Sequence, residues 1–310
     1  MKSDNQPDST DWPAIPYEEW QDTCTTLHLW TQIVGKIRLA LTPWTNHSWH
    51  VPLYLSARGL TTSPIPYGTQ SFEIEFDFIK HQLVIRSSSG EIRLVPLTAQ
   101  PVCDFYQQAI QTLTELNIKL AIHTTPNEIA DAIPFELDTE HAQYEPDQAK
   151  RFWQALVQID RIFKEFRSNF IGKCSPVHFF WGSFDLAVTR FSGREAPPHP
   201  GGIPNFPDWV AREAYSHEVS SAGFWPGAGI GYPAFYSYAY PTPKDFPQAK
   251  VQPGTAFYYD ELGEFILPYD EVRNSASPDE TLLTFLQSSY DAAADQGDWD
   301  RASLELETNM

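Results

Sequence analysis

The chain has 310 residues, of which 42% are hydrophobic and 14% aromatic, so it can bury a sizeable core. Its formal net charge of −19, from 40 acidic against 21 basic residues, argues against nucleic acid and anionic membrane surfaces as partners. No stretch approaches the roughly 20 apolar residues of a membrane helix, and the N-terminus lacks the apolar segment of a secretory signal, so we expect a cytoplasmic protein.

Regular elements are expected along the first half of the chain. A helix begins near Pro16, and its apolar residues recur at alternating spacings of four and three up to Leu41. Residues 71–79, SFEIEFDFI, alternate apolar and acidic positions, which is typical of a strand with one wet face. An antiparallel meander continues through 82–97, and residues 101–116 are expected to be helical.

The middle of the chain is expected to alternate strands and helices. Residues 118–126 resemble a strand, and residues 147–170 form a strongly amphipathic helix pattern. Residues 176–191, PVHFFWGSFDLAVTRF, are predicted to form one long strand that is apolar on both faces. Residues 193–233 are rich in proline and glycine, which indicates a long ordered loop.

The C-terminal part is predicted to add a strand at 234–240, a hairpin at 255–269 and a last helix at 278–296. A capping box at Ser277 would open that helix and Gly297 would end it. Hairpins and meanders separated by helices indicate an α+β fold with a mostly antiparallel sheet and several packed helices.

The three cysteines, Cys24, Cys103 and Cys174, are far apart and odd in number, so free thiols in a reducing compartment are expected. No Cys or His spacing typical of a structural zinc site occurs. Phosphate-binding glycine motifs are also lacking, and the sequence indicates no particular cofactor.

The densest group of reactive residue types lies between 178 and 227. Three interpretations of these polar groups are open: structural pairing of Asp185 with arginine, an anion-recognising pocket, and a metal or acid–base centre. The metal alternative draws on His178, His199, His217 and Glu218. The anion-recognising pocket would use the scarce cations Lys36, Arg38, Arg58, Arg190 and Arg194 beside aromatic segments.

The leading hypothesis is an enzyme that acts on a small anionic metabolite. His217 would be the general acid or base, because histidine titrates near neutrality, with Glu218 or Asp185 as the accompanying carboxylate. The expected ligand-binding residues are His178, Trp181, Arg190, Arg194, Trp225, Lys36 and Arg58. The alternative is a protein that binds a small ligand or a partner without catalysis; the oligomeric state is not indicated.

Four phrases carry a resemblance to a known family: LHLWTQIVGKIRLAL (27–41), SWHVPLYLSARGLTTSPIPYG (48–68), HFFWGSFDLAVTRFSGR (178–194) and AYSHEVSSAGFWPG (214–227). The chain resembles an uncharacterised bacterial family catalogued as domain of unknown function (DUF) 5996. The likeness covers about residues 15 to 295, and it implies a soluble bacterial protein without implying an activity.

We therefore expect one α+β domain over residues 15–297, with a loose N-terminal tail at 1–14 and a polar acidic tail at 298–310. An aromatic-lined pocket would lie between the first helix, the 58–68 turn, the 178–191 strand and the 215–227 segment.

Overall fold

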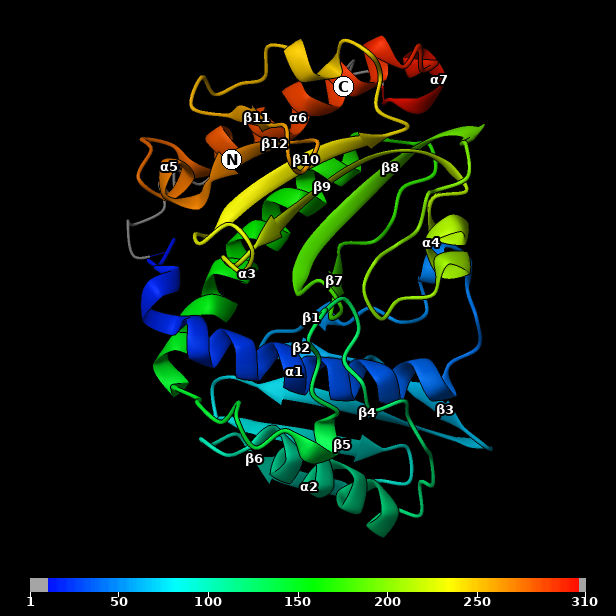
Figure 1. Cartoon of the computed structure of the whole chain (residues 1–310), viewed down its shortest axis with the longest axis vertical. Helices are drawn as coiled ribbons and strands as arrows, with labels where there is room; N and C mark the ends of the chain where they lie inside the picture. The colour runs from blue at the N-terminus through cyan, green and yellow to red at the C-terminus, as the bar shows by residue number, and fades with distance from the viewer. Residues whose placement is uncertain (1–10, 307–310) are drawn as a thin grey trace, which may run out of the picture.

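The computed structural model describes residues 11–306 and has an α+β fold built on two six-stranded sheets. Every strand pair in both sheets is antiparallel, which confirms the predicted fold class. The first sheet has the order β1-β2-β4-β5-β6, with β3 paired to β4, and the second has the order β11-β12-β10-β9-β8-β7. Figure 1 shows the two sheets at opposite ends of the molecule.

The helices and strands follow the chain in this order. The first half contains α1 (Tyr17–Leu41), β1 (Tyr54–Leu55), β2 (Gly59–Thr61), β3 (Ile65–Tyr67), β4 (Gln70–Asp77), β5 (Gln82–Ser87), β6 (Ile92–Pro96), α2 (Val102–Glu115) and α3 (Pro146–Ser168). The second half contains β7 (His178–Phe180), β8 (Asp185–Glu195), α4 (Asp208–Ala214), β9 (His217–Trp225), β10 (Ala234–Tyr240), β11 (Phe257–Tyr259), β12 (Glu264–Pro268), α5 (Tyr269–Arg273), α6 (Pro278–Gln296) and α7 (Arg301–Leu304).

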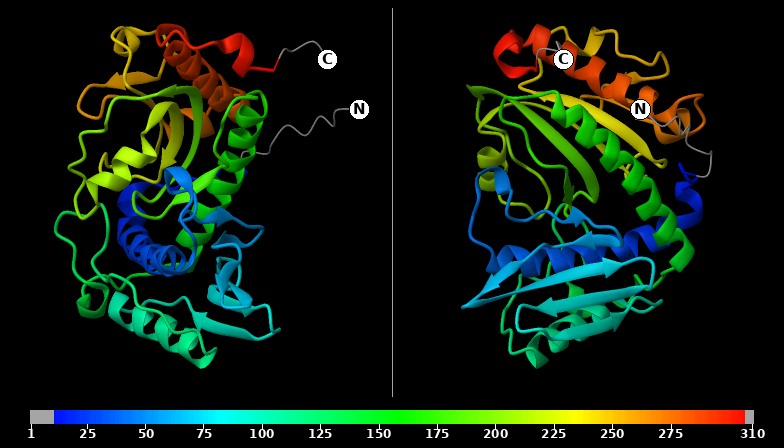
Figure 2. Two further views of the ribbon diagram at one scale, coloured as in Figure 1. Left: turned by 90° about the vertical axis from the view of Figure 1, so that its right-hand side faces the viewer. Right: turned by 180° about the vertical axis from the view of Figure 1, so that it is seen from behind.

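Helix α1 crosses the middle of the molecule between the levels of the two sheets (Figures 1 and 2). Its residues from Thr23 to Arg38 are buried on nearly every side, as expected of a helix enclosed by other elements. Helices α3 and α6 contact each other and pack against the second sheet. One buried core runs through all of these elements and joins the two sheets.

The predicted long strand at 178–191 is wrong, because the chain reverses there and forms the hairpin β7–β8. Phe184 adopts a left-handed backbone conformation, with φ of 57°, at the turn. The tip docks on α1, where Trp181 packs on Gly35 and donates from Nε1 to the carbonyl oxygen of Val51. A Cβ at Gly35 would lie 2.3 Å from the Trp181 ring, so this approach requires glycine.

Other differences from the sequence prediction are local. Residues 118–126 contain no strand, and the segment predicted as a loop at 193–233 contains both α4 and β9. Helix α6 has its predicted bounds, although the Ser277 side chain makes no capping hydrogen bond.

The fold also reaches beyond the predicted domain boundaries. Trp12 is 1% exposed and packs on Tyr269, so the core begins within the segment predicted to be a loose tail. At the other end, α7 lies within the predicted acidic tail, and Leu304 is buried. Residues 1–10 and 307–310 of the two tails lie outside the described part of the chain. Among residues 11–306, no helix combines the length and hydrophobicity needed to span a membrane.

Candidate functional site: an acid–tyrosine cluster on the second sheet

The second sheet has two faces of different character. Residues that alternate along each strand and pair across the ladders share a face. The face against α3 and α6 is apolar, with Leu186, Ala222, Phe224, Phe235 and Phe265. The opposite face, here called the polar face, carries Asp185, Thr189, Ser221, Trp225, Tyr236, Tyr238 and Glu264. The candidate site lies on the polar face.

Asp185 begins β8 and is 3% exposed. Its two carboxylate oxygens accept hydrogen bonds from the hydroxyls of Ser183 and Tyr236. Trp225 stacks on Tyr236 with 4.3 Å between the ring centroids. Burial raises the pKa of Asp185 to about 6, because desolvation of the carboxylate outweighs these two hydrogen bonds. Asp185 is therefore a buried acid that titrates close to neutral pH.

Two further carboxyl groups interact electrostatically with Asp185. A Cβ at Gly182 would fall 2.0 Å from Oε1 of Glu128, so the bare backbone at Gly182 makes room for this carboxyl. Glu264 begins β12, and its Oε2 is buried without a hydrogen-bond partner. Desolvation, and secondly the charge of Asp185, raise the pKa of Glu128 to about 7 and that of Glu264 to about 8.

The three acids and the aromatic residues around them form what we call the acid–tyrosine cluster. The hydroxyls of Tyr215 and Tyr238 lie 2.7 Å apart, and the charges of all three acids help to raise the pKa of Tyr215. Within residues 11–306, none of the three carboxylates forms an ion pair with Lys, Arg or His. The cluster consists of Glu128, Asp185, Glu264, Tyr215, Tyr236, Tyr238 and Trp225.

Helix α1 fixes the loop that brings Glu128 to the cluster. Gln32 donates to the carbonyl oxygen of Asn127 at 2.9 Å and accepts from its backbone N–H at 2.7 Å. Lys36 donates to the carbonyl oxygen of Thr125 at 2.7 Å. Lys36 was expected in an anion clamp, but its ammonium holds this loop, and desolvation lowers its pKa to about 8.

Arg190 does not join Asp185, because the two side chains lie on opposite faces of β8. Its guanidinium is enclosed by aromatic rings from α3 and α6, with Cζ 3.5 Å from the centroid of Phe166 and 4.2 Å from that of Tyr290. It also donates to the carbonyl oxygen of Phe166. The structure therefore gives Arg190 a role in core packing, where cation–π contacts offset the burial of its charge.

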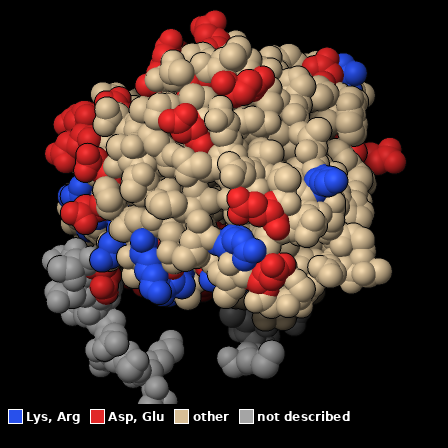
Figure 3. Space-filling model, turned by 90° about the horizontal axis from the view of Figure 1, so that it is seen from below, with Lys and Arg blue, Asp and Glu red and all other residues tan. Residues whose placement is uncertain are grey.

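Two of the other predicted arginines, Arg194 and Arg58, are engaged in ion pairs. Arg194 pairs with Glu218 at 2.7 Å and donates to the carbonyl oxygens of Gly297 and Asp298 at the end of α6. Arg58 pairs with Asp77 in the first sheet. On the face seen from below, Lys and Arg side chains lie next to Asp and Glu side chains (Figure 3). The predicted cations therefore do not converge on one clamp.

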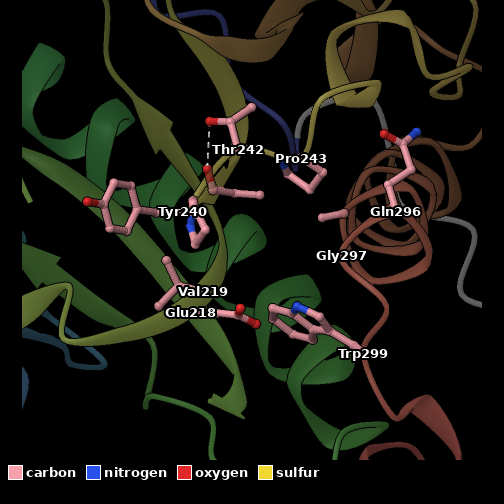
Figure 4. Close-up of a pocket in the computed structure, with 11 residues that line it drawn as sticks. Glu218, Val219, Tyr240, Thr242, Pro243, Gln296, Gly297 and Trp299 are labelled. Carbon is pink, nitrogen blue, oxygen red and sulfur yellow. Dashed lines mark hydrogen bonds between the residues drawn. The ribbon is translucent and has the colours of Figure 1, made fainter. Parts of the chain in front are cut away.

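Glu218 lines a pocket of about 120 Å³ between the ends of β9 and β10 and the end of α6. Its carboxylate points toward the ring of Trp299 (Figure 4), and it accepts hydrogen bonds from Arg194 and Ser192. Because Glu218 faces the helices, it does not share the surface of the acid–tyrosine cluster.

His217 lies at the other end of the polar face. It pairs with Glu195 beyond an irregularity in β8, and along β9 it is seven residues from Phe224, which pairs with Leu186 next to Asp185, so the separation from Asp185 is roughly 25 Å at the usual rise of a strand. Asp185 therefore cannot be the carboxylate that accompanies His217, and the prediction is wrong for this one of the two candidates.

The surroundings of His217 contain a second group of titratable side chains. His47, whose ring centroid is 5.8 Å away, bonds from Nδ1 to the carbonyl oxygen of Ala214, which can only accept. Its Nε2 therefore accepts from the ammonium of Lys173, at 2.6 Å.

His178 and Trp181 belong to the β7–β8 hairpin, and both are buried. His199 stacks on Tyr215. Within the described chain, no group of three or more His, Cys, Asp or Glu residues could hold a metal ion, so the four residues of the predicted metal centre do not form one.

Of the predicted site residues, the acid–tyrosine cluster contains Asp185 and Trp225. Glu128, Glu264 and the tyrosines were missed. The signal for two of the tyrosines is present in the sequence: AFYSYAY places Tyr236 and Tyr238 on one face of a strand. Glu128 and Glu264 have no local signal, because they reach Asp185 from distant parts of the chain.

A family model described as "Family of unknown function (DUF5996)" matches residues 12–306, so the chain belongs to this family. No curated protein and no solved structure matches it.

Proposed function

We propose that this DUF5996 family member binds a small organic cation, such as a primary amine, at the acid–tyrosine cluster. The proposal rests on one observation: Asp185 and the two glutamates that its charge acts on, Glu128 and Glu264, form no ion pair with Lys, Arg or His within residues 11–306. Buried charges are stable when they are paired and hydrogen-bonded, and an ammonium group supplies both a positive charge and three donors.

The aromatic side chains support the same ligand class. The stacked rings of Trp225 and Tyr236 stand beside Asp185, and Tyr238 is nearly parallel to Tyr236 at 6.1 Å. Aromatic faces attract cations and also contact the apolar part of an organic ligand. The anionic metabolite expected from the sequence would be repelled by the three acids.

Thermal unfolding in the presence of butylammonium or tetramethylammonium chloride tests the proposal. We expect either cation to raise the melting temperature above that in sodium chloride of equal ionic strength, by about 3 °C at ten times Kd. The shift should be larger at pH 8 than at pH 5.5, because the pKa values of the three acids, about 6 to 8, leave them mostly protonated at the lower pH.

Matched substitutions locate the binding. Asp185→Asn and Glu264→Gln should abolish the cation-dependent shift, because each removes one carboxylate from the cluster. Glu218→Gln is the control, since Glu218 faces the opposite side of the sheet and pairs with Arg194. Equal shifts in sodium chloride and in the organic cations, or an unchanged shift in Asp185→Asn, would rule the proposal out.

A second candidate function is acid–base catalysis on the bound cation. Carboxyl groups with pKa values of about 6, 7 and 8 can both give and take a proton near neutrality, which favours this chemistry. Incubation with a bacterial metabolite extract, followed by mass spectrometry, tests it: the wild type and Glu218→Gln should consume an amine that Asp185→Asn leaves unchanged. An extract unchanged by the wild type would argue for binding alone.

A further inference from the structure

Another buried cation without an acidic partner lies near the end of α1. Arg38 is 7% exposed, and within residues 11–306 its guanidinium forms no ion pair with Asp or Glu. Its Nε donates to the carbonyl oxygen of His50 at 2.7 Å, but its Nη1 is buried with no hydrogen-bond partner. A buried guanidinium with free donors is costly unless an acceptor, and preferably an anion, meets it.

His178, in β7, is another buried side chain whose polar atoms lack hydrogen-bond partners. The residue is fully buried, and neither Nδ1 nor Nε2 has a hydrogen-bond partner in the described chain. Burial first, and the nearby charge of Arg38 second, lower the pKa of His178 to about 3, so its imidazole is neutral. A neutral imidazole still offers one N–H donor.

The two side chains flank the same aromatic ring. Cζ of Arg38 lies 5.4 Å from the centroid of Tyr54, and the His178 ring meets Tyr54 edge-on at 5.6 Å. Trp49 also contacts His178, at 5.9 Å between centroids. Tyr54 and Trp49 are themselves half-buried. Ser48, beside Trp49, adds a buried hydroxyl without a partner.

We propose that Arg38 and His178 form a binding site for a small oxyanion, with Tyr54 and Trp49 as its aromatic walls. The guanidinium would supply charge and N–H donors to the oxyanion, and the imidazole would supply one further N–H. The charge of Glu213 acts on His50, whose carbonyl oxygen accepts from Arg38, but within residues 11–306 Glu213 forms no ion pair or hydrogen bond with the guanidinium of Arg38.

Carboxylates and phosphates share this oxyanion chemistry, and the rings favour a ligand with a planar apolar part. Sodium benzoate and sodium phosphate, each compared with sodium chloride at equal ionic strength, separate the two sources. We expect a rise in melting temperature with at least one of them, of about 3 °C at ten times Kd. A wild type that responds to neither beyond chloride would overturn the proposal.

Substitutions test the two donors separately. Arg38→Met and His178→Phe keep the approximate size of each side chain and remove its donors, so each should lose the anion-dependent shift relative to its own anion-free melting temperature. Arg161→Met is the control, because Arg161 is half exposed and pairs with Asp279 on the surface. A shift that persists in both Arg38→Met and His178→Phe would place the anion elsewhere.

Crystals of the wild type give a measurement that does not depend on the variants folding. Soaking with 4-bromobenzoate or selenate should produce density for the oxyanion with one oxygen within hydrogen-bond distance of Nη1 of Arg38, and the anomalous signal of bromine or selenium should identify the bound ligand. Density found only at exposed lysines or arginines would refute the assignment. Because this site uses none of the acid–tyrosine cluster, failure of the amine experiment leaves it standing, and its own failure leaves the amine site standing.

Discussion

Replacement of Glu264 by glutamine should make the protein more stable at pH 8 than the wild type and leave it nearly unchanged at pH 5. The pKa of Glu264 is raised from 4.5 to about 8, so the folded state holds a proton that the unfolded state releases above pH 4.5. The wild type therefore loses stability as pH rises through this window, by at most about 5 kcal/mol at 1.36 kcal/mol per pH unit. Glutamine has nearly the shape of the glutamate side chain and does not ionise in this pH range.

The expected difference at pH 8 is smaller than this limit. Glu264 is only half-buried, so water screens its charge, and its titration is coupled to that of the other two acids. We therefore expect a difference in unfolding free energy of about 2 to 3 kcal/mol. Urea unfolding of both proteins between pH 5 and pH 8.5 measures it. The gain of Glu264→Gln over the wild type should grow with pH up to about 8 and then level off, whereas Glu218→Gln should show no such gain. A difference between Glu264→Gln and the wild type that is independent of pH would refute this account.

Two other substitution and reactivity experiments follow from local packing. Gly35→Ala should destabilise the fold by about 2 kcal/mol, because its Cβ would overlap the Trp181 ring, whereas Gly254→Ala, with open space around it, should change the urea midpoint little. An unchanged midpoint for Gly35→Ala would contradict the tight helix–hairpin contact. Cys174 should react with a disulfide reagent at pH 8 about 100-fold more slowly in the folded protein than in urea, because burial raises its pKa to about 11. Equal rates measured by absorbance would show that this thiol is not desolvated.

Elements with a strong residue pattern could be predicted from the sequence. Helix α3 has a single buried stripe, and its periodicity identifies it. The alternation of apolar and acidic residues identifies β4 as a strand, although the predicted wet face is wrong for Glu75 and Asp77, which are buried beside Arg86 and Arg58. The hairpin β7–β8 could not be predicted in this way, because both of its strands are largely buried and no polar alternation marks the reversal at Ser183. Residues 118–126 have a strand-like composition but no neighbouring strand, and pairing is a tertiary property.

The candidate site was predictable only in part, for a similar reason. Asp185 could be recognised as a polar group within an apolar run, since such a group requires a partner. Its partners come from a loop after α2, from β10 and from β12, and no local pattern links those segments. The predicted arginine clamp was wrong. The sequence shows that Arg190 is one of few cations and is near aromatic residues, but it does not show which face of the strand Arg190 occupies.

The two proposed sites together explain why oppositely charged groups remain unpaired inside one protein. The acid–tyrosine cluster contains three carboxyl groups without a cation, and Arg38 is a buried cation without an acid. Arg38 and the three acids form no ion pair with each other within residues 11–306, and their aromatic neighbours differ, because Arg38 lies over Tyr54 whereas Asp185 bonds to Tyr236, which stacks on Trp225. Buried charges that a fold keeps unpaired reduce its stability, so ligands of the opposite charge give a physical reason for both arrangements.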